Sequence, residues 1–226
     1  MDMSLYSPSS RALDRLREVR FVAVVGPTAV GKTTLIREAM QRNSSLHLVL
    51  NNTSRTPRPD EQEGVDYRFE TRDAMEQRIE HGEYVQVAPS VFGDLYATAA
   101  DDYSTEGVAV LPVLADALPQ FRALPFKEMR CIYVLPPDWE TWQARIAKHN
   151  FAPDKLAARL REAQRSLTVA KQDSELEFII SRSIESATND FMRLALAQPY
   201  TETLQADQEL AVGIIASLLA RLDRVL

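Results

Sequence analysis

The octapeptide GPTAVGKT, residues 26–33, constrains the fold of this chain more than any other feature. It fits the pattern G-x-x-x-x-G-K-[ST] of a phosphate-binding loop, which joins a strand to a helix. The residues before it, FVAVV (21–25), are apolar and rich in β-branched side chains, as in a buried parallel strand. The residues after it, TLIREAMQR (34–42), have a helical pattern. The sequence therefore predicts a strand, a phosphate loop and a helix in succession.

Strand-like and helix-like segments alternate along the rest of the chain. This alternation predicts an α/β fold with a mainly parallel core sheet, and the loop makes it the three-layer fold of P-loop NTPases. Further strands are expected at 46–52, just after Gly82, at 107–114, at 129–135 and at 177–181. Helices are expected at 10–19, from Thr71 to a stop at Gly82, at 138–150, at 153–172 and at 207–226.

The composition is that of an ordinary globular protein, with 226 residues, a net charge of −6 and a sequence pI of about 5.2. This length suits one good-sized domain. The acidic balance argues against a nucleic-acid coat or a basic membrane patch, so any anion site must be local. The single cysteine, Cys131, cannot form an internal disulfide, and Cys and His show no metal-ligand spacing. With no signal-peptide pattern and no apolar run near the roughly 20 residues that span a bilayer, we expect a cytoplasmic protein.

The loop residues indicate what the site binds. Gly26 and Gly31 allow backbone N–H groups to turn toward phosphate oxygens, and the helix N-terminus adds partial positive charge. Lys32 is expected to reach the β- and γ-phosphates of ATP, and the Thr33 hydroxyl to complete the shell of a Mg²⁺ ion. The expected contacts with ATP are Gly26, Ala29, Val30, Gly31, Lys32, Thr33 and Thr34.

The stretch SRTPRPDEQEGVDYRF, residues 54–69, predicts a second phosphate site. Arg55 and Arg58 are three residues apart, and Pro57 and Pro59 stiffen the backbone that presents them. Guanidinium groups bind phosphate oxygens in a bidentate fashion, and tyrosine hydroxyls can add single hydrogen bonds. The four side chains that suit one phosphate monoester are Arg55, Arg58, Tyr67 and Tyr96.

The same stretch resembles the acceptor-binding region of guanylate kinases, whose pattern is roughly T-R-x-P-R, a short acidic loop and G-x-D-Y-x-F. The resemblance continues through TRDAMEQRIEHGEYVQVA (71–88), GDLYATA (93–99) and ARLREAQRSL (158–167). Together with the phosphate loop it covers about residues 20–185, and the combination of motifs is specific.

The resemblance implies a single domain over residues 1–226, built as a three-part kinase. The core takes in about residues 20–50, 101–136 and 158–226, the acceptor-binding insertion about 51–100, and the lid about 137–157. Such an enzyme transfers a phosphoryl group from ATP to an acceptor phosphate, which depends on positioning and on charge neutralisation. The second lid arginine of the family falls near His149, or is replaced by Arg145 or Lys148. By resemblance, the catalytic residues are Lys32, Arg58, Arg145 and Arg159.

The residues that read the guanine base in this family are changed here. A serine corresponds to Asn51, a glutamate to Gln86, and the aspartate of a D-x-D segment to Leu114. A carboxylate accepts from guanine N1–H and N2–H, whereas Gln86 offers one acceptor and one donor. A mismatch of this kind costs about 1–3 kcal/mol. The metal ligand is then Thr33, alone with the phosphates or with Asp116 nearby. The expected acceptor contacts are Asn51, Arg55, Arg58, Tyr67, Gln86, Tyr96 and Thr98.

These changes leave the small phosphorylated acceptor open. GMP or dGMP is the first expectation, and AMP or ribose 1,5-bisphosphate, which some guanylate kinase-like enzymes use, is the alternative. A non-catalytic binding module, as in scaffolding proteins, is a third hypothesis, although Lys32 and Thr33 favour an enzyme. We expect no nucleic-acid or membrane partner, and a monomer or a homodimer. The last helix is expected to pack its apolar face on the core or on a second copy, through Leu210, Ile214, Leu218 and Leu222.

Overall fold

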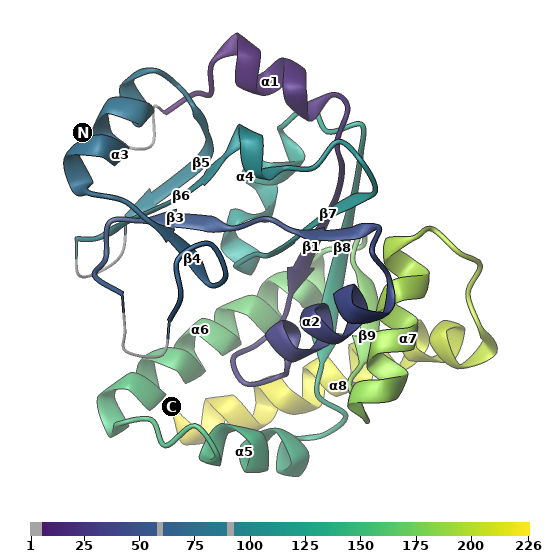
Figure 1. Ribbon diagram of the computed structural model, residues 1–226. Coiled ribbons are helices and arrows are strands. Elements are labelled where there is room, and N and C mark those ends of the chain that lie inside the picture. Colours follow the sequence, from purple (N-terminus) through teal and green to yellow (C-terminus); the bar gives the residue numbers. More distant parts are fainter. Residues whose placement is uncertain (1–5, 58–60, 90–92) are drawn as a thin grey trace. The chain divides into compact units, whose positions relative to one another are not determined.

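The structure, a computed structural model, describes residues 6–57, 61–89 and 93–226 (Figure 1). The chain forms two compact units, each of which combines segments that are distant in sequence. The first unit holds the described residues up to Phe21 and those of His47–Leu111 and Gln120–Met129. The second unit holds Val22–Leu46, Pro112–Pro119 and Arg130–Leu226. Within the described ranges, no helix has the length and apolar character needed to cross a membrane.

A five-stranded sheet has the strand order β2-β7-β1-β8-β9, so strands that follow one another in sequence are not neighbours and need crossover connections. β8 and β9 run parallel, with Ile132 opposite Glu177 and Leu135 opposite Ile180. This order is that of the predicted α/β fold. The strands are β2 (Leu46–Leu48), β7 (Val108–Pro112), β1 (Arg20–Val25), β8 (Glu128–Leu135) and β9 (Glu177–Ile180).

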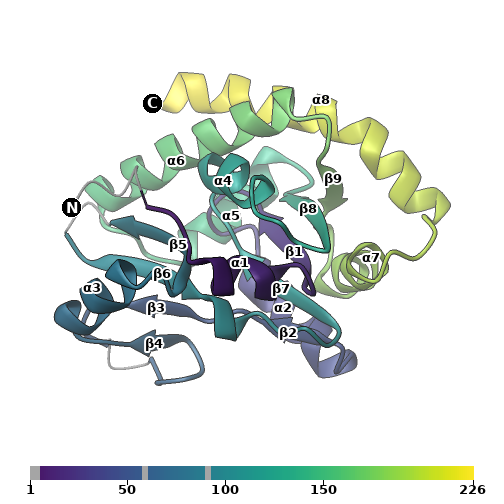
Figure 2. The same ribbon diagram turned by 90° about the horizontal axis from the view of Figure 1, so that it is seen from above.

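The helices of the second unit form two layers, one on each face of its strands. α2 packs with α7, and α6 packs with α8 (Figures 1 and 2). Side-chain caps fix where two of them begin, since Asp138 accepts from the Thr141 N–H and Ser183 from the Ser186 N–H. The helices are α2 (Lys32–Arg42), α5 (Trp139–Ala147), α6 (Pro153–Gln172), α7 (Ile184–Ala195) and α8 (Glu202–Val225), and the short η3 (Ala115–Ala117) and α4 (Leu118–Arg122) follow β7.

Helix α8 is tied to strand β9 by side chains that bond to the strand backbone. Gln208 accepts from the Phe178 N–H at 2.8 Å and donates to the Phe178 carbonyl at 2.7 Å. Asp207 is fully buried, accepts from the Ile180 N–H at 3.3 Å and pairs with Arg182 at 2.7 Å. Because a buried polar group without a partner is costly, these bonds hold α8 in one register on the strand.

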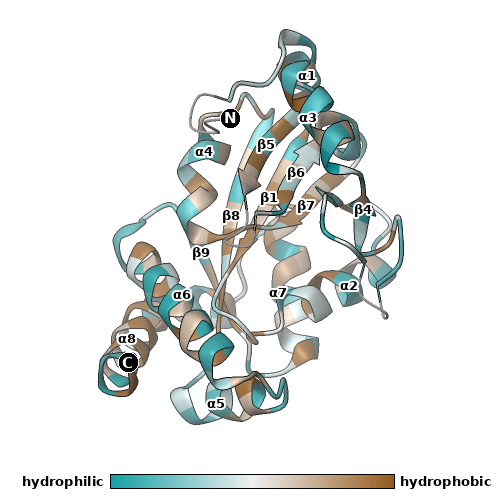
Figure 3. Ribbon diagram, turned by 90° about the vertical axis from the view of Figure 1, so that its left-hand side faces the viewer, coloured by the Kyte–Doolittle hydropathy of each residue, from teal (hydrophilic) through white to brown (hydrophobic). Residues whose placement is uncertain are grey.

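The buried face of α8 differs from the predicted one. Leu218 and Leu222 are fully buried as expected, but Leu210 is 52% exposed and Ile214 is only partly buried. The expected stripe took every fourth residue, which drifts around a helix with 3.6 residues per turn. Figure 3 shows polar and apolar residues interspersed along α8. The buried residues are Leu204, Asp207, Ala211, Ile215, Leu218 and Leu222.

The first unit contains a four-stranded sheet with the order β4-β3-β6-β5. β3 pairs parallel with β4 and antiparallel with β6, and β5 pairs antiparallel with β6. One face is apolar and packs against α3, where Met75 and Ile79 of the helix cluster with Leu95 and Ala97 of the sheet. The elements of this unit are α1 (Ser10–Leu16), β3 (Asn51–Thr53), β4 (Tyr67–Phe69), α3 (Arg72–Glu80), β5 (Tyr84–Pro89), β6 (Leu95–Ala99) and the 3-10 turn η2 (Ala100–Asp102).

The single strand predicted at 46–52 is wrong, because the structure divides this segment between the two sheets. Leu46–Leu48 forms β2 in the five-stranded sheet, and Asn51–Thr53 forms β3 in the four-stranded sheet. Val49, between them, is buried and donates to the Val110 carbonyl at 2.9 Å. An apolar run does not mark the residue at which a chain leaves one sheet for another. The sequence patterns also did not predict strands β4 and β6 or helix α7.

The segments predicted as helices at 71–81, 138–150 and 153–172 are confirmed as α3, α5 and α6. Gly82 ends α3 as expected. Its φ is +65°, which favours glycine, and a Cβ there would lie 2.7 Å from the Ser9 backbone nitrogen. The stop at Gly82 therefore reflects both the turn and the segment that packs on it.

Replacing Asp207 with alanine should lower the free energy of unfolding by about 3 kcal/mol, because Arg182 and the Ile180 N–H lose a buried acceptor. Urea denaturation followed by circular dichroism measures this change. Glu209→Ala removes a carboxylate from an exposed position of the same helix and should have little effect. Equal losses in the two variants would contradict this role of Asp207.

Candidate active site

The phosphate loop lies between β1 and α2, as its motif requires, and its backbone adopts conformations that favour glycine. Gly26 has φ +146°, and a Cβ there would lie 2.4 Å from the Val134 carbonyl oxygen. Gly31 has φ +104° and caps α2. Ala29 has φ +59°, a left-handed conformation that costs an alanine roughly 1 kcal/mol. The loop therefore passes directly against the end of β8, and a non-glycine residue at Gly26 would displace it.

Side chains bond to the carbonyl groups of this loop. Lys32 Nζ donates to the carbonyls of Gly26 and Pro27. From α5, Trp142 Nε1 donates to the Thr28 carbonyl at 2.8 Å and Arg145 to the Val30 carbonyl at 3.1 Å. In a trans peptide the next N–H points opposite to the carbonyl, and the described residues contain no cis peptide. The N–H groups that follow Thr28 and Val30 therefore point away from α5.

Lys32 lies in a charged, partly enclosed environment. Burial lowers the pKa of Lys32 to about 8, with Glu162 acting to raise this pKa and Arg159 acting to lower it. A phosphate arriving near Nζ would favour the protonated form. The lysine is thus protonated at neutral pH and becomes neutral at a lower pH than an ordinary lysine.

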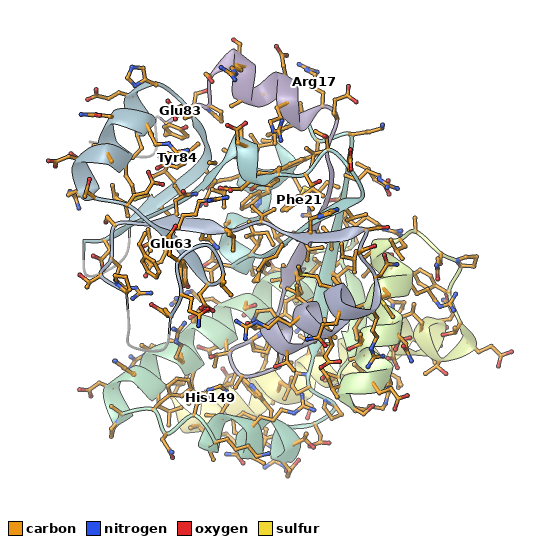
Figure 4. The ribbon with its side chains drawn as sticks, viewed as in Figure 1. Arg17, Phe21, Glu63, Glu83, Tyr84 and His149 are labelled. Carbon is orange, nitrogen blue, oxygen red and sulfur yellow. The ribbon has the colours of Figure 1, made fainter. Side chains whose placement is uncertain are left out.

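The expected lid arginines have different surroundings. Arg145 is half-buried and also donates to Ser181, at 3.1 Å to Oγ and 2.6 Å to the carbonyl, so it joins the loop to the end of β9. Arg159 is 52% exposed and pairs with Glu162 on its own helix at 2.9 Å. His149, labelled in Figure 4, is exposed, and its ring stacks on Phe151 with the centroids 5.2 Å apart. Arg145 is thus bonded to two other segments, whereas Arg159 is exposed and pairs with a neighbour on its own helix.

The residues considered for metal binding lie at two places in the second unit. Thr33 and Thr34 are exposed in the first turn of α2. Asp116 is exposed on η3 and lies 3.7 Å from Arg165 of α6, and Leu114 is 60% exposed. Across the residues that the structure describes, no group of three or more His, Cys, Asp or Glu side chains is arranged to hold a metal ion. Thr33 lies at the start of α2 with its side chain exposed, and its role as a metal ligand stays a prediction.

In the first unit, Arg55 is the centre of the predicted acceptor clamp. Its Nε donates to the Tyr96 hydroxyl at 3.1 Å, and its Nη2 donates to both carboxylate oxygens of Glu61 at 2.8 Å. The guanidinium lies 5.4 Å from the centre of the Tyr67 ring. Its side chain is 15% exposed. Arg58, the second predicted arginine, lies outside the described residues. The structure thus gathers three of the four clamp residues, with a carboxylate bound to the arginine.

The other predicted acceptor residues form a row across the four-stranded sheet. Asn51 is opposite Tyr67, and Gln86 is opposite Thr98. The register of β3 and β6 places Asn51 beside Thr98 as well, since Asn52 pairs with Ala97. Opposite residues point to the same face of a sheet. Asn51 and Gln86 are partly buried, and their side chains have no hydrogen-bond partner within the described residues, whereas Thr98 is fully buried between them.

The sequence did not predict the polar residues that lie next to this row and on the opposite face of the sheet. The hydroxyl of Thr98 lies 3.0 Å from the hydroxyl of Tyr103, which is fully buried. On the opposite face, Asn52 donates to Asp102 at 3.2 Å, and Arg68 donates to Asp102 at 2.7 Å. Trp142 and Ser181, which support the phosphate loop, were missed too. Arg68 occupies the variable position of the D-Y-x-F pattern, and Asn52, Asp102, Tyr103, Trp142 and Ser181 lie outside the motifs quoted above, so no motif identifies them.

The chain was compared with known families, curated proteins and solved structures. The guanylate kinase family model matches residues 18–194. The guanylate kinase of Mycobacterium leprae is 33% identical over 183 residues, which cover 77% of this chain and 85% of the relative. That of Mycobacterium sp. (strain MCS) is also 33% identical, over 77% of this chain and 90% of the relative.

A crystal structure of guanylate kinase from Anaplasma phagocytophilum has a similar fold, with a TM-score of 0.59 and 20% identity, over 81% of this chain and 87% of that one. This similarity confirms the predicted fold class. Because the family model covers most of the sequence and relatives match more than three quarters of it, the chain belongs to the guanylate kinase family.

Proposed function

We propose that the protein transfers the γ-phosphoryl group of ATP to the phosphate of GMP or dGMP, forming ADP and the nucleoside diphosphate. The observation that supports this proposal is that one chain contains two groups of residues suited to bind phosphate. One is the loop around Lys32, and the other is the clamp around Arg55. Membership of the guanylate kinase family supports this class of reaction.

On the donor side, the chain supplies positive charge and fixed geometry. The ammonium group of Lys32 and the loop N–H groups would hold the β- and γ-phosphates. Trp142 and Arg145 keep the loop carbonyls turned away, so the loop needs little reorganisation when ATP binds. Arg159 is exposed and lies near enough to Lys32 to affect its pKa, so it is suited to reach the transferring group. Charge stabilisation of this kind accounts for most of the catalysis in phosphoryl transfer.

The loop suits a Mg²⁺ ion that is shared with the nucleotide. The Thr33 hydroxyl is a hard oxygen ligand of the type that Mg²⁺ prefers, and its exposure at the start of α2 leaves it accessible. Bound there with phosphate oxygens and water, the ion would neutralise charge on the β- and γ-phosphates. The Asp116 carboxylate faces Arg165, so Thr33 is the stronger of the two candidate ligands.

On the acceptor side, Arg55 would bind the phosphate of the nucleoside monophosphate in place of Glu61. A phosphate presents two oxygens to a guanidinium much as a carboxylate does. Tyr67 and Tyr96 already surround the guanidinium, so the site needs only to release the carboxylate. Arg58 would complete the clamp.

Asn51 and Gln86 would face the base from the same side of the sheet. The donors and acceptors of both amides have no partner among the described residues, so they would form the hydrogen bonds to guanine. Neither amide offers the two acceptor oxygens of a carboxylate. The relatives are named guanylate kinase, which favours GMP over AMP, over ribose 1,5-bisphosphate and over a non-catalytic module. ATP and GMP are cytoplasmic metabolites, so we place the reaction in the cytoplasm, in a monomer or a homodimer without a nucleic-acid partner.

A coupled ADP-release assay with ATP and Mg²⁺ tests the proposal directly. GMP and dGMP should be phosphorylated much faster than AMP, CMP, UMP or ribose 1,5-bisphosphate. Lys32→Ala should reduce kcat by a factor of about 100 or more, because it removes the charge that the loop places on the phosphates. Preference for another acceptor would contradict GMP as the substrate, and no turnover with ATP bound would support the binding-module alternative.

The pH dependence should reflect Lys32. Because its pKa is lowered to about 8, the protonated form that binds phosphate is present below pH 8 and is lost as the pH rises through this value. The kcat/KM for ATP should therefore fall about tenfold per pH unit above 8, whereas kcat should fall less, since bound ATP favours the charged lysine. Lys32→Arg keeps its charge and should show no such fall. A flat profile up to pH 10 in the unaltered protein would refute this assignment.

Gln86→Glu should increase the preference for GMP. The carboxylate can accept from both N1–H and N2–H of guanine, so the ratio of kcat/KM for GMP to that for AMP should rise roughly tenfold to a hundredfold. Gln77→Glu adds the same charge at an exposed position of α3 and should leave the ratio unchanged. If Gln86→Glu also leaves it unchanged, Gln86 does not face the base.

A further inference from the structure

Helix α1 lies before the part of the chain that the guanylate kinase family model matches. Residues in and next to α1 form hydrogen bonds with the first unit's four-stranded sheet and the turns beside it. The family match begins at residue 18, whereas α1 ends at Leu16. Just before α1, Ser9 N–H donates to the Gly82 carbonyl at 2.8 Å, and the Tyr6 hydroxyl donates to the Tyr84 carbonyl. Figure 4 shows Arg17 at the end of α1, Glu83 just before β5 and Tyr84 at its start. The segment is therefore a fixed part of the first unit.

Arg15 of α1 fixes the turn that follows β6. Its Nε donates to the Ala100 carbonyl at 2.9 Å, and Nη2 donates to the Tyr103 carbonyl at 3.3 Å. Asp101 lies 3.7 Å from Nε and is largely exposed, so it adds little. A guanidinium that bridges two carbonyls holds both ends of the η2 turn in one conformation.

Tyr103, at the end of this turn, brings a hydroxyl to Thr98, which belongs to the acceptor row. It is fully buried, and its ring packs on Phe21 with centroids 5.6 Å apart. Its hydroxyl lies 3.0 Å from Thr98 Oγ1. Burial raises the pKa of Tyr103 well above its usual range, so the phenol stays protonated. The Tyr103–Thr98 pair is thus a fixed hydrogen bond inside the unit.

Thr98 connects this pair to the base-facing side chains. It is opposite Gln86 on β5 and beside Asn51 on β3, and it is buried where those two amides are accessible. A shift of Thr98 would change the spacing between the amides. Since hydrogen-bonding sites discriminate only when their donors and acceptors are held in place, this spacing matters for the acceptor.

We propose that Arg15 and Tyr103 are positioning residues of the acceptor site. They act through Thr98, which forms the floor between Asn51 and Gln86, and so α1 contributes to recognition of the acceptor without touching it. This inference rests on the proposed function, because it concerns the site assigned there to the base of the nucleoside monophosphate.

The test compares Tyr103→Phe with Tyr133→Phe. Tyr133 is also a fully buried tyrosine, and its hydroxyl lies 2.9 Å from Ser166 Oγ in the second unit, so each variant removes one buried hydroxyl pair. Tyr103→Phe should raise the KM for GMP about fivefold, the effect expected for one hydrogen bond, and leave the KM for ATP and kcat unchanged. Tyr133→Phe should leave the KM for GMP unchanged. Equal effects on the KM for GMP would mean that only stability is involved.

Thr98→Val removes the same hydrogen bond from its other end. If Tyr103 acts through Thr98, the double variant should have the same KM for GMP as Thr98→Val alone, since the two effects are not additive. Full additivity, or an unchanged KM in both single variants, would overturn the proposal.

Arg15→Ala tests the link to α1, with Arg17→Ala as the matched control, because Arg17 pairs with Asp14 at the surface. Arg15→Ala should raise the KM for GMP and speed amide hydrogen exchange in Leu95–Tyr103 at least tenfold, and Arg15→Lys should restore part of both. Arg17→Ala should change neither. If the unaltered protein does not phosphorylate GMP, the proposed function fails, and unchanged exchange in Arg15→Ala separately overturns the link to α1.

Discussion

The donor site depends on how the carbonyl groups of the phosphate loop are satisfied. Loop carbonyls accept hydrogen bonds from Lys32, Trp142 and Arg145, and peptide geometry turns the N–H groups that follow Thr28 and Val30 away from α5. The close approach of Gly26 to the Val134 carbonyl is possible only because glycine has no Cβ. A loop fixed in this way is organised before a nucleotide arrives, and the binding free energy does not have to supply that order.

The four-stranded sheet has one apolar face and one face that carries the residues proposed to bind the acceptor. Alternation along each strand produces this division, since Leu95, Ala97 and Ala99 of β6 pack in the cluster with α3, while Tyr96 and Thr98 point to the other side. The packing of the apolar cluster against α3 therefore fixes the positions of the side chains on the other face of the sheet. Arg55, held by Tyr96 and Glu61, illustrates how a charged group is kept in a defined place while it is largely shielded from water.

The sequence predicted the features that rest on local patterns. The phosphate loop, α3 with its stop at Gly82, and α5 and α6 all have strong periodicity or glycine signals. It could not predict that residues 46–52 divide between two sheets, or which face of α8 is buried, because these depend on neighbours in space. The motifs also led to Arg55, Tyr67 and Tyr96, which lie together in the structure, and their role as a phosphate clamp stays a prediction. Tyr103 and Trp142 were missed, since a single tyrosine or tryptophan carries no pattern.

The bonds between Gln208 and Phe178 have a consequence for self-association. β9 is the last strand of its sheet, and the N–H and carbonyl of Phe178 are the groups that an added strand would use. The amide of Gln208 occupies both. An exposed strand edge is a common starting point for aggregation. Here the Gln208 side chain takes the hydrogen bonds that a further strand would form, and it adds no unpaired backbone groups of its own.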